Sequence, residues 1–267
     1  MAIINKTNIT VPEVLEDLFQ YDYENALVLG KLAYHDNTLV GAPGDTVTVP
    51  YTAPLTDAET VAEGDALTPE SNQDGKVTVK VSKAGKAVQI TQEAINSCAY
   101  DVKSSRREQI AKAIARKVDK DLMGALDKTL LKATTTAGLT YAEIVKAKAK
   151  LGEEAFVNTP VLIVNSADYA NLAVTDDFIK GAVQLTDFGV NAAAMLVDMP
   201  VIVSDNVPAK TAYLVTPGSF VLVNKQEPTL YFDVNALSEE TVMSAFMHYG
   251  VELPNKKRGV VKITITQ

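Results

Sequence analysis

Apolar residues recur at helical spacing along one stretch, from about Asp101 to Lys132, which carries the longest uninterrupted helical pattern in the sequence. Small or apolar side chains flank the main line of apolar positions, so the stripe is continuous. Ser105 and Glu108 have the spacing of a capping box, which satisfies amide groups of the first helical turn. The pattern predicts a helix of roughly 27 residues, about 40 Å long, that crosses a whole domain. The stripe consists of Ile110, Ile114, Val118, Leu122, Leu126 and Leu130, flanked by Ala111, Ala115 and Met123.

The opposite face of this predicted helix is strongly basic. Such a face is most often simply solvated. A basic face of this length is also suited to receive an acidic surface, and the chain itself contains a candidate. The face carries Lys103, Arg106, Arg107, Lys112, Arg116, Lys117 and Lys120, with Asp119 and Asp121 among them.

Two segments upstream alternate between valine and polar residues. Thr46–Tyr51 and Lys76–Val81 each place valine on one face and threonine or lysine on the other, which predicts a pair of strands. The stretch between them, 52–75, contains acidic residues and no basic residue. Because so long a loop is unusual in a compact domain, we interpret it as an arm that reaches a neighbouring subunit. Its acidic residues are Asp57, Glu59, Glu63, Asp65, Glu70 and Asp74.

The other segments predict short helices among many strands. An amphipathic helix is expected from Pro12 to about Phe19, in a segment too polar to form its own core. Thr140 and Glu143 suggest a second capping box, and Ser166 is expected to cap another short helix. This mixture lacks a βαβα rhythm and therefore predicts an α+β fold. Turns or irregular structure are expected at 35–37, 82–86 and 176–191, and strands at 161–164, 200–204, 213–215, 220–223, 229–232, 241–252 and 260–266.

Composition narrows the class of protein. The 267 residues, 47% of them hydrophobic, are enough for one large domain or two lobes. The net charge of −8 argues against tight nonspecific binding of nucleic acid, although a protein can enclose nucleic acid without binding it tightly. The sequence has neither a signal peptide nor an apolar run of about 18 residues, so no membrane partner is expected.

Residues with catalytic or metal-binding potential are few. The chain has two histidines and one cysteine, and neither histidine has a second ligand at metal-binding spacing. We expect His35 in a turn, His248 on a sheet face and Cys98 as a buried thiol. No catalytic, cofactor-binding or metal-binding residue is predicted. A cytoplasmic hydrolase that uses Cys98 or a carboxylate pair remains an alternative.

The order of these elements resembles that of the major capsid proteins of tailed bacteriophages, whose fold is shared with encapsulins. GKVTVKVSKAGKAVQITQEAINS (75–97) resembles the descending arm of the extended loop and the approach to the long "spine" helix. TYAEIVKAKAKLGEEAFVNTPVLIVNSADYANLAV (140–174) and DMPVIVSDNVP (198–208) resemble parts of the axial lobe. AYLVTPGSFVLVNKQEPTLYFD (212–233) and HYGVELPNKKRGVVKIT (248–264) resemble the return to the peripheral lobe. One departure is Asp198, where the family often has glycine.

This resemblance implies a structural protein of the virion, not an enzyme, that assembles in the host cytoplasm. Its copies would form pentamers and hexamers that close into an icosahedral shell around double-stranded DNA. The absence of a long N-terminal helical extension favours a separate scaffolding protein, and a portal protein is a further implied partner. The implied division is an N-terminal arm (1–40), an extended loop (41–92), a peripheral domain with the spine helix (93–155), an axial domain (156–227) and return strands (228–267).

The resemblance also implies that the extended loop of one subunit lies over its neighbour. We therefore hypothesise contacts between the acidic loop residues, from Asp57 to Asp74, and Arg106, Arg107, Lys112 and Arg116 of the next subunit. Two alternatives within the structural class are an encapsulin-like bacterial compartment and a phage tail or decoration protein.

Overall fold

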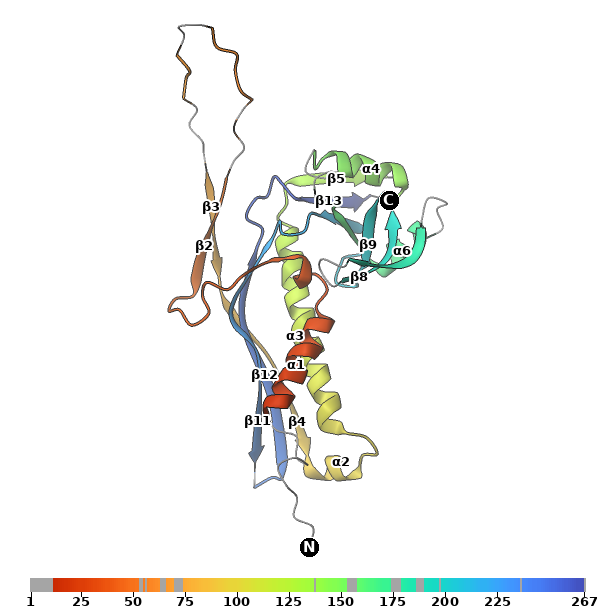
Figure 1. The fold of residues 1–267 in the computed structure, drawn as a ribbon. Helices are drawn as coiled ribbons and strands as arrows, with labels where there is room; N and C mark the ends of the chain where they lie inside the picture. The colour runs from red at the N-terminus through yellow and green to blue at the C-terminus, as the bar shows by residue number, and fades with distance from the viewer. Residues whose placement is uncertain are drawn as a thin grey trace.

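The structure is a computed structural model that describes residues 12–52, 55, 57–62, 66–69, 74–136, 138–152, 158–173, 179–185, 190–196, 198–235 and 237–266. The molecule is elongated, with a long helix beside a long sheet, a hairpin that projects from one end and a second sheet to one side (Figure 1). The helices are α1 (Pro12–Ala26), η2 (Gly30–Leu32), α2 (Gln92–Ser97), α3 (Val102–Leu126), α4 (Tyr141–Ala149) and α6 (Ser166–Leu172).

The strands of the described residues form three sheets. The order is β1-β11-β12-β4 in the first, β5-β13-β10-β6-β9-β8-β7 in the second and β2-β3 in the third. The strands are β1 (Tyr34–Asp36), β2 (Thr46–Tyr51), β3 (Gly75–Lys80), β4 (Ser82–Thr91), β5 (Leu131–Thr135), β6 (Val161–Val164), β7 (Ile179–Leu185), β8 (Val190–Leu196), β9 (Met199–Val203), β10 (Thr211–Val215), β11 (Val221–Asn235), β12 (Glu240–Glu252) and β13 (Val260–Ile265).

The long helix α3 forms where the apolar stripe predicts it, but both ends differ from the prediction. Its N-cap is Asp101, whose carboxylate accepts hydrogen bonds from the amides of Lys103 and Ser104, so the capping box at Ser105 is wrong. The helix stops at Leu126, and the chain then enters β5. Leu130, expected in the stripe, is instead 60% exposed.

The first sheet and α3 share a core with the N-terminal helix. The stripe residues of α3 are buried against β12 and β4, and α1 packs on α3 and β11. Phe19, Tyr23 and Leu27 supply the buried face of α1. Helix α1 therefore covers the core of its own chain.

The seven-stranded sheet has its own core under α4 and α6. Strand β6 is buried along its whole length, as its unbroken apolar sequence predicts, and pairs with β9 and β10. Two details of the helices differ from expectation. Asn165, rather than Ser166, caps α6 by accepting the amide of Ala167, and the side chain of Thr140 makes no capping bond to α4.

Three segments expected to be turns or irregular contain strands. His35 lies in β1, parallel to β11, and the turn follows after Asp36. Residues 82–86 belong to a continuous β4, which pairs with β12 from Ser82 to Thr91. Part of 176–191 forms the antiparallel strands β7 and β8, whose weak apolar alternation concealed them. Asp176 and Asp177 lie outside the described residues.

The position that departs from the resembled family has an unusual backbone conformation. Asp198, in the turn between β8 and β9, has φ of 57°, in the left-handed region that favours glycine. Lys210 (φ 61°) and Glu239 (φ 47°) share this conformation. The turn at Asp198 therefore forms without the glycine, with an acidic residue in a conformation that aspartate tolerates better than most side chains.

Candidate assembly surfaces

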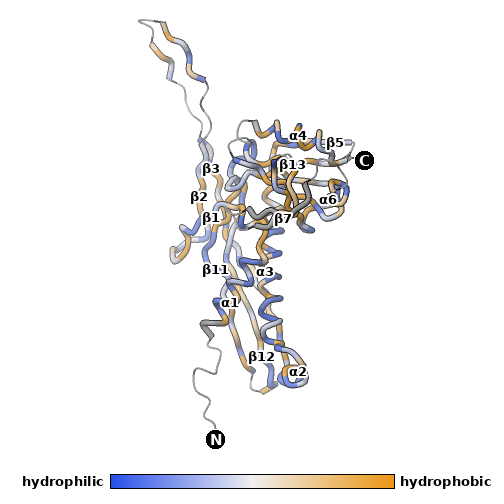
Figure 2. Tube along the Cα trace, turned by 45° about the vertical axis from the view of Figure 1, so that its right-hand side comes forward, coloured by the Kyte–Doolittle hydropathy of each residue, from blue (hydrophilic) through white to orange (hydrophobic). Residues whose placement is uncertain are grey.

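The β2–β3 hairpin stands away from the rest of the chain (Figure 1). The strands pair from Thr46 with Lys80 to Tyr51 with Gly75, so the predicted pair of strands is confirmed and its valines lie opposite one another. Beyond this pair the loop carries large apolar residues in the open: Leu55 is 64% exposed, Val61 38% and Leu67 70%. Figure 2 shows hydrophilic and hydrophobic positions mixed along this loop. A side chain such as Leu67 is therefore mostly exposed and lies outside the hydrophobic core of its own chain.

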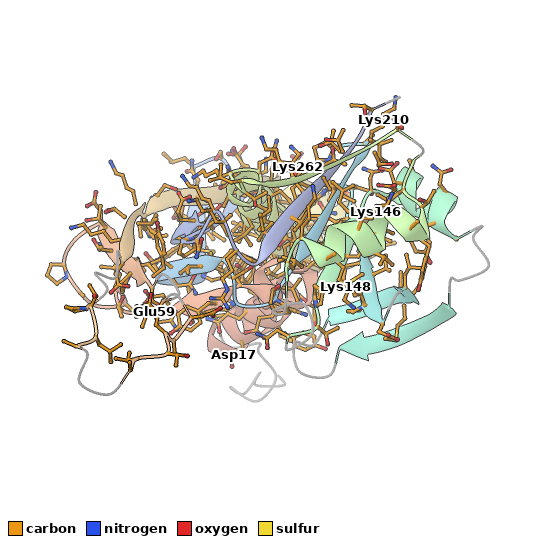
Figure 3. The ribbon with its side chains drawn as sticks, turned by 90° about the horizontal axis from the view of Figure 1, so that it is seen from above. Asp17, Glu59, Lys146, Lys148, Lys210 and Lys262 are labelled. Carbon is orange, nitrogen blue, oxygen red and sulfur yellow. The ribbon has the colours of Figure 1, made fainter. Side chains whose placement is uncertain are left out.

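Three of the six predicted acidic loop residues can be placed. Asp57, Glu59 and Asp74 are exposed, and Glu63, Asp65 and Glu70 lie outside the described residues. Seen from above, Glu59 lies at the hairpin side of the molecule, away from Lys146 and Lys210 (Figure 3). The hairpin therefore presents carboxylates and apolar side chains together.

Three of the four predicted basic partners, Arg106, Lys112 and Arg116, are at least partly exposed. Arg116 is exposed and donates to the carbonyl of Lys112 at 3.2 Å, and Arg106, partly exposed, donates to the side chain of Gln109 at 2.8 Å. In the described part of the chain neither arginine forms an ion pair. Lys112 pairs with Glu108 on the same helix, so part of its charge is already compensated.

The prediction that Arg107 belongs to the exposed basic face is wrong. This residue is 9% exposed, and its Nε donates to Oδ2 of Asp22 on α1 at 3.1 Å. The pair joins the N-terminal helix to α3. Loss of either partner would leave the other charge largely out of water, so breaking this pair is expected to destabilise the subunit.

A second buried charge on α3 also binds the N-terminal segment. Asp119 is 3% exposed, and its carboxylate accepts the amides of Val28, Leu29 and Gly30 at 3.0 to 3.2 Å. Burial raises the pKa of Asp119 to about 6, and the three amide hydrogen bonds oppose that rise. These bonds fix the chain where it leaves α1 and enters η2.

Other acidic residues of α3 join it to both large sheets. Oδ2 of Asp121 accepts the hydroxyl of Tyr249 on β12 at 2.7 Å. Asp127, just past the helix, accepts the hydroxyl of Tyr213 on β10 and pairs with Lys262 on β13 at 2.7 Å. Although partial burial opposes it, the bonds from Lys262 and Tyr213 hold the pKa of Asp127 below its usual value. Carboxylates within α3 and just after it thus tie the helix to the two sheets.

The spacing of residues along the sequence could have indicated that Arg107 and Asp119 are buried, but our prediction did not use it. Arg107 and Asp119 lie on the same row of every fourth residue as Ala111, Ala115 and Met123, which flanks the stripe. A row of small apolar residues faces a neighbouring element closely, so charged members of that row are expected to have partners there. The partners themselves, on α1 and at its C-terminal end, could not be inferred from spacing.

The residues considered for chemistry occupy ordinary structural positions. Cys98 is exposed at the C-cap of α2, so its predicted burial is wrong. His248 lies in β12, as predicted, with Nδ1 2.8 Å from Oε1 of Gln226. Among the described residues no group of three His, Cys, Asp or Glu side chains is placed to hold a metal ion. Within the same residues, no helix has the length and apolar character needed to cross a membrane.

Comparisons with known proteins agree with this arrangement. Residues 75–263 match the family model described as phage capsid protein. The major capsid protein of Staphylococcus phage phiMR11 is 29% identical over 276 residues, which cover 98% of this chain and 96% of that protein. The capsid of a native GTA particle superposes with a TM-score of 0.70 and 15% identity over 91% of both chains. A virus-like particle from Pyrococcus furiosus gives a TM-score of 0.64 and 13% identity over 94% of this chain and 98% of that chain.

A long helix against a long sheet, a projecting hairpin and a second α/β lobe define a protein with the tailed-phage capsid fold, which confirms the predicted fold. The match over residues 75–263 then gives the family: this chain belongs to the phage capsid proteins. That family consists of structural proteins rather than enzymes, so it lends no support to the hydrolase alternative.

Proposed function

We propose that this chain is the major capsid subunit of a phage, and that its copies assemble through pentamers and hexamers into an icosahedral shell around double-stranded DNA. The observation that carries this proposal is the β2–β3 hairpin, which projects from the rest of its own subunit (Figure 1) and whose loop exposes Leu55 and Leu67. Exposed apolar residues on a projecting arm are suited to an interface between subunits. Assembly in the host cytoplasm, a separate scaffolding protein and a portal protein complete the proposal.

The proposal assigns a role to each region. Residues 1–40 are the N-terminal arm, 41–92 the extended loop and 93–155 the peripheral domain with the spine helix. Residues 156–227 form the axial domain, and 228–267 return to the peripheral domain. In this division, α3 supports the part of the shell wall that the hairpin of the next subunit overlaps.

The hairpin of one subunit is proposed to contact the basic face of α3 in the next, with apolar residues of the loop supplying most of the stabilisation. Asp57, Glu59 and Asp74 face Arg106 and Arg116 in this arrangement. Arg107 has a structural role within the subunit, and Lys112 contributes less because Glu108 already pairs with it. Each exposed pair contributes only about 0–1 kcal/mol, so the charges mainly select the register of docking.

A charge exchange tests these contacts. Arg106→Glu with Arg116→Glu should reduce assembly and leave thermal unfolding unchanged, because neither arginine forms an ion pair within the described part of the subunit. Adding Asp57→Lys and Glu59→Lys to the same chain should restore particles. If the quadruple variant assembles no better than the arginine pair alone, these residues do not meet between subunits.

A shortened hairpin loop tests whether residues 52–74 are needed for assembly. Replacing 52–74 by Asn-Gly preserves the pairing of Tyr51 with Gly75, because a two-residue turn of this kind closes that register. We expect the wild type to sediment as particles and the shortened protein as folded subunits with an unchanged circular dichroism spectrum. Normal particles from the shortened protein would show that residues 52–74 are not needed for assembly.

The second candidate function is an encapsulin-like compartment. The likeness to the virus-like particle from Pyrococcus furiosus favours this candidate, since that particle shares the fold. Purified particles distinguish the two functions by their contents: phage capsids assembled in infected cells contain double-stranded DNA, whereas a compartment contains protein cargo.

A further inference from the structure

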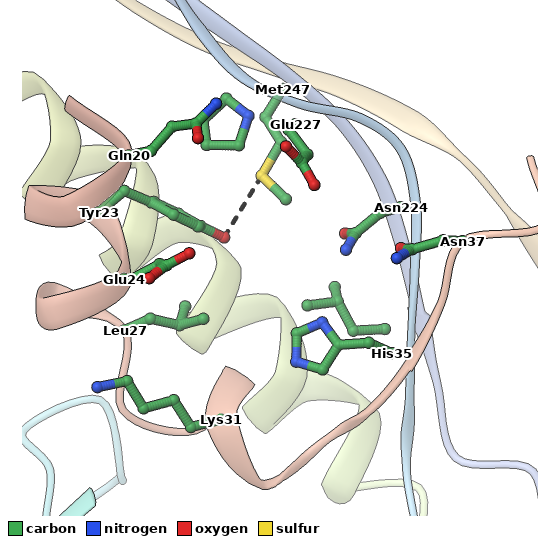
Figure 4. A pocket seen from close by; sticks show the side chains of 12 residues that line it. Gln20, Tyr23, Glu24, Leu27, Lys31, His35, Asn37, Asn224, Glu227 and Met247 are labelled. Carbon is green, nitrogen blue, oxygen red and sulfur yellow. Dashed lines mark hydrogen bonds between the residues drawn. The ribbon is translucent and has the colours of Figure 1, made fainter. Parts of the chain in front are cut away.

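A pocket of about 370 Å³ lies between the N-terminal helix and the first sheet (Figure 4). Helix α1 forms one wall, β11 the other, and the segment through η2 and β1 closes one side. Its apolar floor includes Leu27, Leu222 and Met247, all buried. This volume is within the range of small-ligand sites.

The wall formed by β11 is irregular at this pocket. The pairing of β11 with β12 shifts between Asn224 and Gln226 and again between Gln226 and Thr229. Bulges of this kind redirect side chains, and here they lie beside the pocket-lining Asn224, Glu227 and Pro228. Two shifts within six residues interrupt an otherwise regular pairing from Val221 to Asn235.

A buried acceptor in the pocket has no donor. Asn224 is 9% exposed, and its Oδ1 has no hydrogen-bond partner in the described part of the chain. Figure 4 shows its amide end directed into the pocket. Since a buried amide oxygen without a donor is destabilising, this atom indicates a ligand that donates a hydrogen bond.

The other groups at the pocket also favour a donor with positive charge. Glu24 on α1 and Glu227 on β11 bring two carboxylates to the rim, whereas the ammonium end of Lys31 extends away from the middle of the pocket (Figure 4). Burial, followed by the negative charges of Asp119, Glu24 and Glu227, raises the pKa of Tyr23. The negative field of these carboxylates thus reaches the Tyr23 hydroxyl, which lies inside the pocket and donates to Sδ of Met247 at 3.5 Å.

We propose that this pocket binds a guanidinium or primary ammonium group carried on an aliphatic stem. The charged end would donate to Oδ1 of Asn224 and to the carboxylates of Glu24 and Glu227, and the stem would pack on Leu27, Leu222 and Met247. Such a group is supplied by an arginine or lysine side chain of a protein segment, or by a free aliphatic amine. The proposed assembly into shells is not needed for this binding.

Ligand-observed saturation-transfer NMR on purified subunits tests the site. The probes are N-acetyl-arginine methylamide for a side chain, putrescine for a free amine and N-acetyl-norleucine methylamide as the uncharged control. The variant is Glu227→Gln, and Glu59→Gln on the hairpin is the matched control. Both substitutions neutralise an exposed carboxylate, so thermal unfolding should stay unchanged in each.

We expect a cationic probe to bind, with dissociation constants about tenfold higher for Glu227→Gln and unchanged for Glu59→Gln. Tighter binding of the arginine probe assigns the site to a protein side chain, and tighter binding of putrescine assigns it to a free amine. The proposal is overturned if neither cation binds, if norleucine binds equally well, or if Glu227→Gln binds like the wild type. Because the readout is probe binding to subunits, such a failure would leave the shell proposal standing.

Discussion

At the scale of single residues, the charged groups inside α3 determine how the N-terminal segment is held. Arg107 and Asp119 together fix both ends of the chain segment from α1 to η2, through Asp22 and through three backbone amides. Most charged side chains of the same helix are in solvent. The monomer therefore depends on two charges that a helical pattern alone would assign to the surface.

Asp119 should make stability depend on pH. Its folded pKa of about 6 lies above the ordinary 3.8, so the folded protein binds the proton more tightly than the unfolded chain does. Protonation of Asp119 adds roughly 3 kcal/mol to the free energy of unfolding. This contribution is fully present below about pH 4 and is lost as the pH rises through about 6. Urea unfolding of the wild type and of Asp119→Asn at pH 4.5 and 7 should show the cost of the substitution decreasing with pH.

The control for this measurement is Asp17→Asn, since Asp17 is an exposed carboxyl on α1. Its effect should be small and the same at both pH values. A cost of Asp119→Asn that grows with pH would contradict the assignment of burial as the dominant influence on this carboxyl.

Lys210 should be replaceable by glycine with a gain in stability. Its φ of 61° is unfavourable for a side chain with a Cβ, and its backbone bonds to Asp168 and Ile265 do not depend on the lysine side chain. We expect Lys210→Gly to raise the free energy of unfolding by about 1 kcal/mol. Lys210→Ala keeps the Cβ and should change it little, so a glycine variant no more stable than the alanine variant would exclude backbone strain at this position.

At the scale of elements, the start of α3 provides a direct comparison between predicted and observed caps. Asp101 accepts two amides of the first turn, whereas the predicted capping residue Ser105 lies inside the helix. Asp101→Ala should therefore cost about 1 kcal/mol in chemical denaturation, and Ser105→Ala much less. Equal costs would mean that the cap contributes no more than ordinary helix propensity.

The ion pair between α1 and α3 should be essential to their packing. Arg107→Ala leaves Asp22 without its partner at a site where both side chains are mostly buried, and we expect a loss of about 3 kcal/mol. Arg106→Ala, at the next position but partly exposed, should cost less than about 0.5 kcal/mol. Thermal unfolding of the two variants measures the difference, and similar melting temperatures would show that the Asp22 contact contributes little.

The sequence predicted most of the helices and strands but few of the contacts between them. Helix α3 and the strands β2 and β3 follow from regular apolar spacing, which remains visible because each element buries one face. Strand β5 was missed because Leu130 and Leu131 extend the helical stripe past the true end of α3. The pocket beside Asn224 arises from bulges and from segments far apart in sequence, and neither leaves a periodic signal.

At the scale of the whole molecule, the shape is unfavourable for a protein that acts alone. The long sheet, the separate seven-stranded sheet and the projecting hairpin give the chain a large surface, and residues such as Leu67 and Leu237 are exposed at 70% and 100%. Leu237 lies in the turn between β11 and β12, at the end of the molecule remote from the hairpin. Both extremities therefore present apolar side chains suited to contact with other subunits.

The most direct test of this account is electron microscopy of the purified, expressed protein, with size-exclusion chromatography of the same sample. The account predicts closed particles, or rings of five and six subunits, either from the protein alone or after co-expression with a scaffolding protein. A monodisperse monomer under both conditions would contradict the claim that this chain builds a shell.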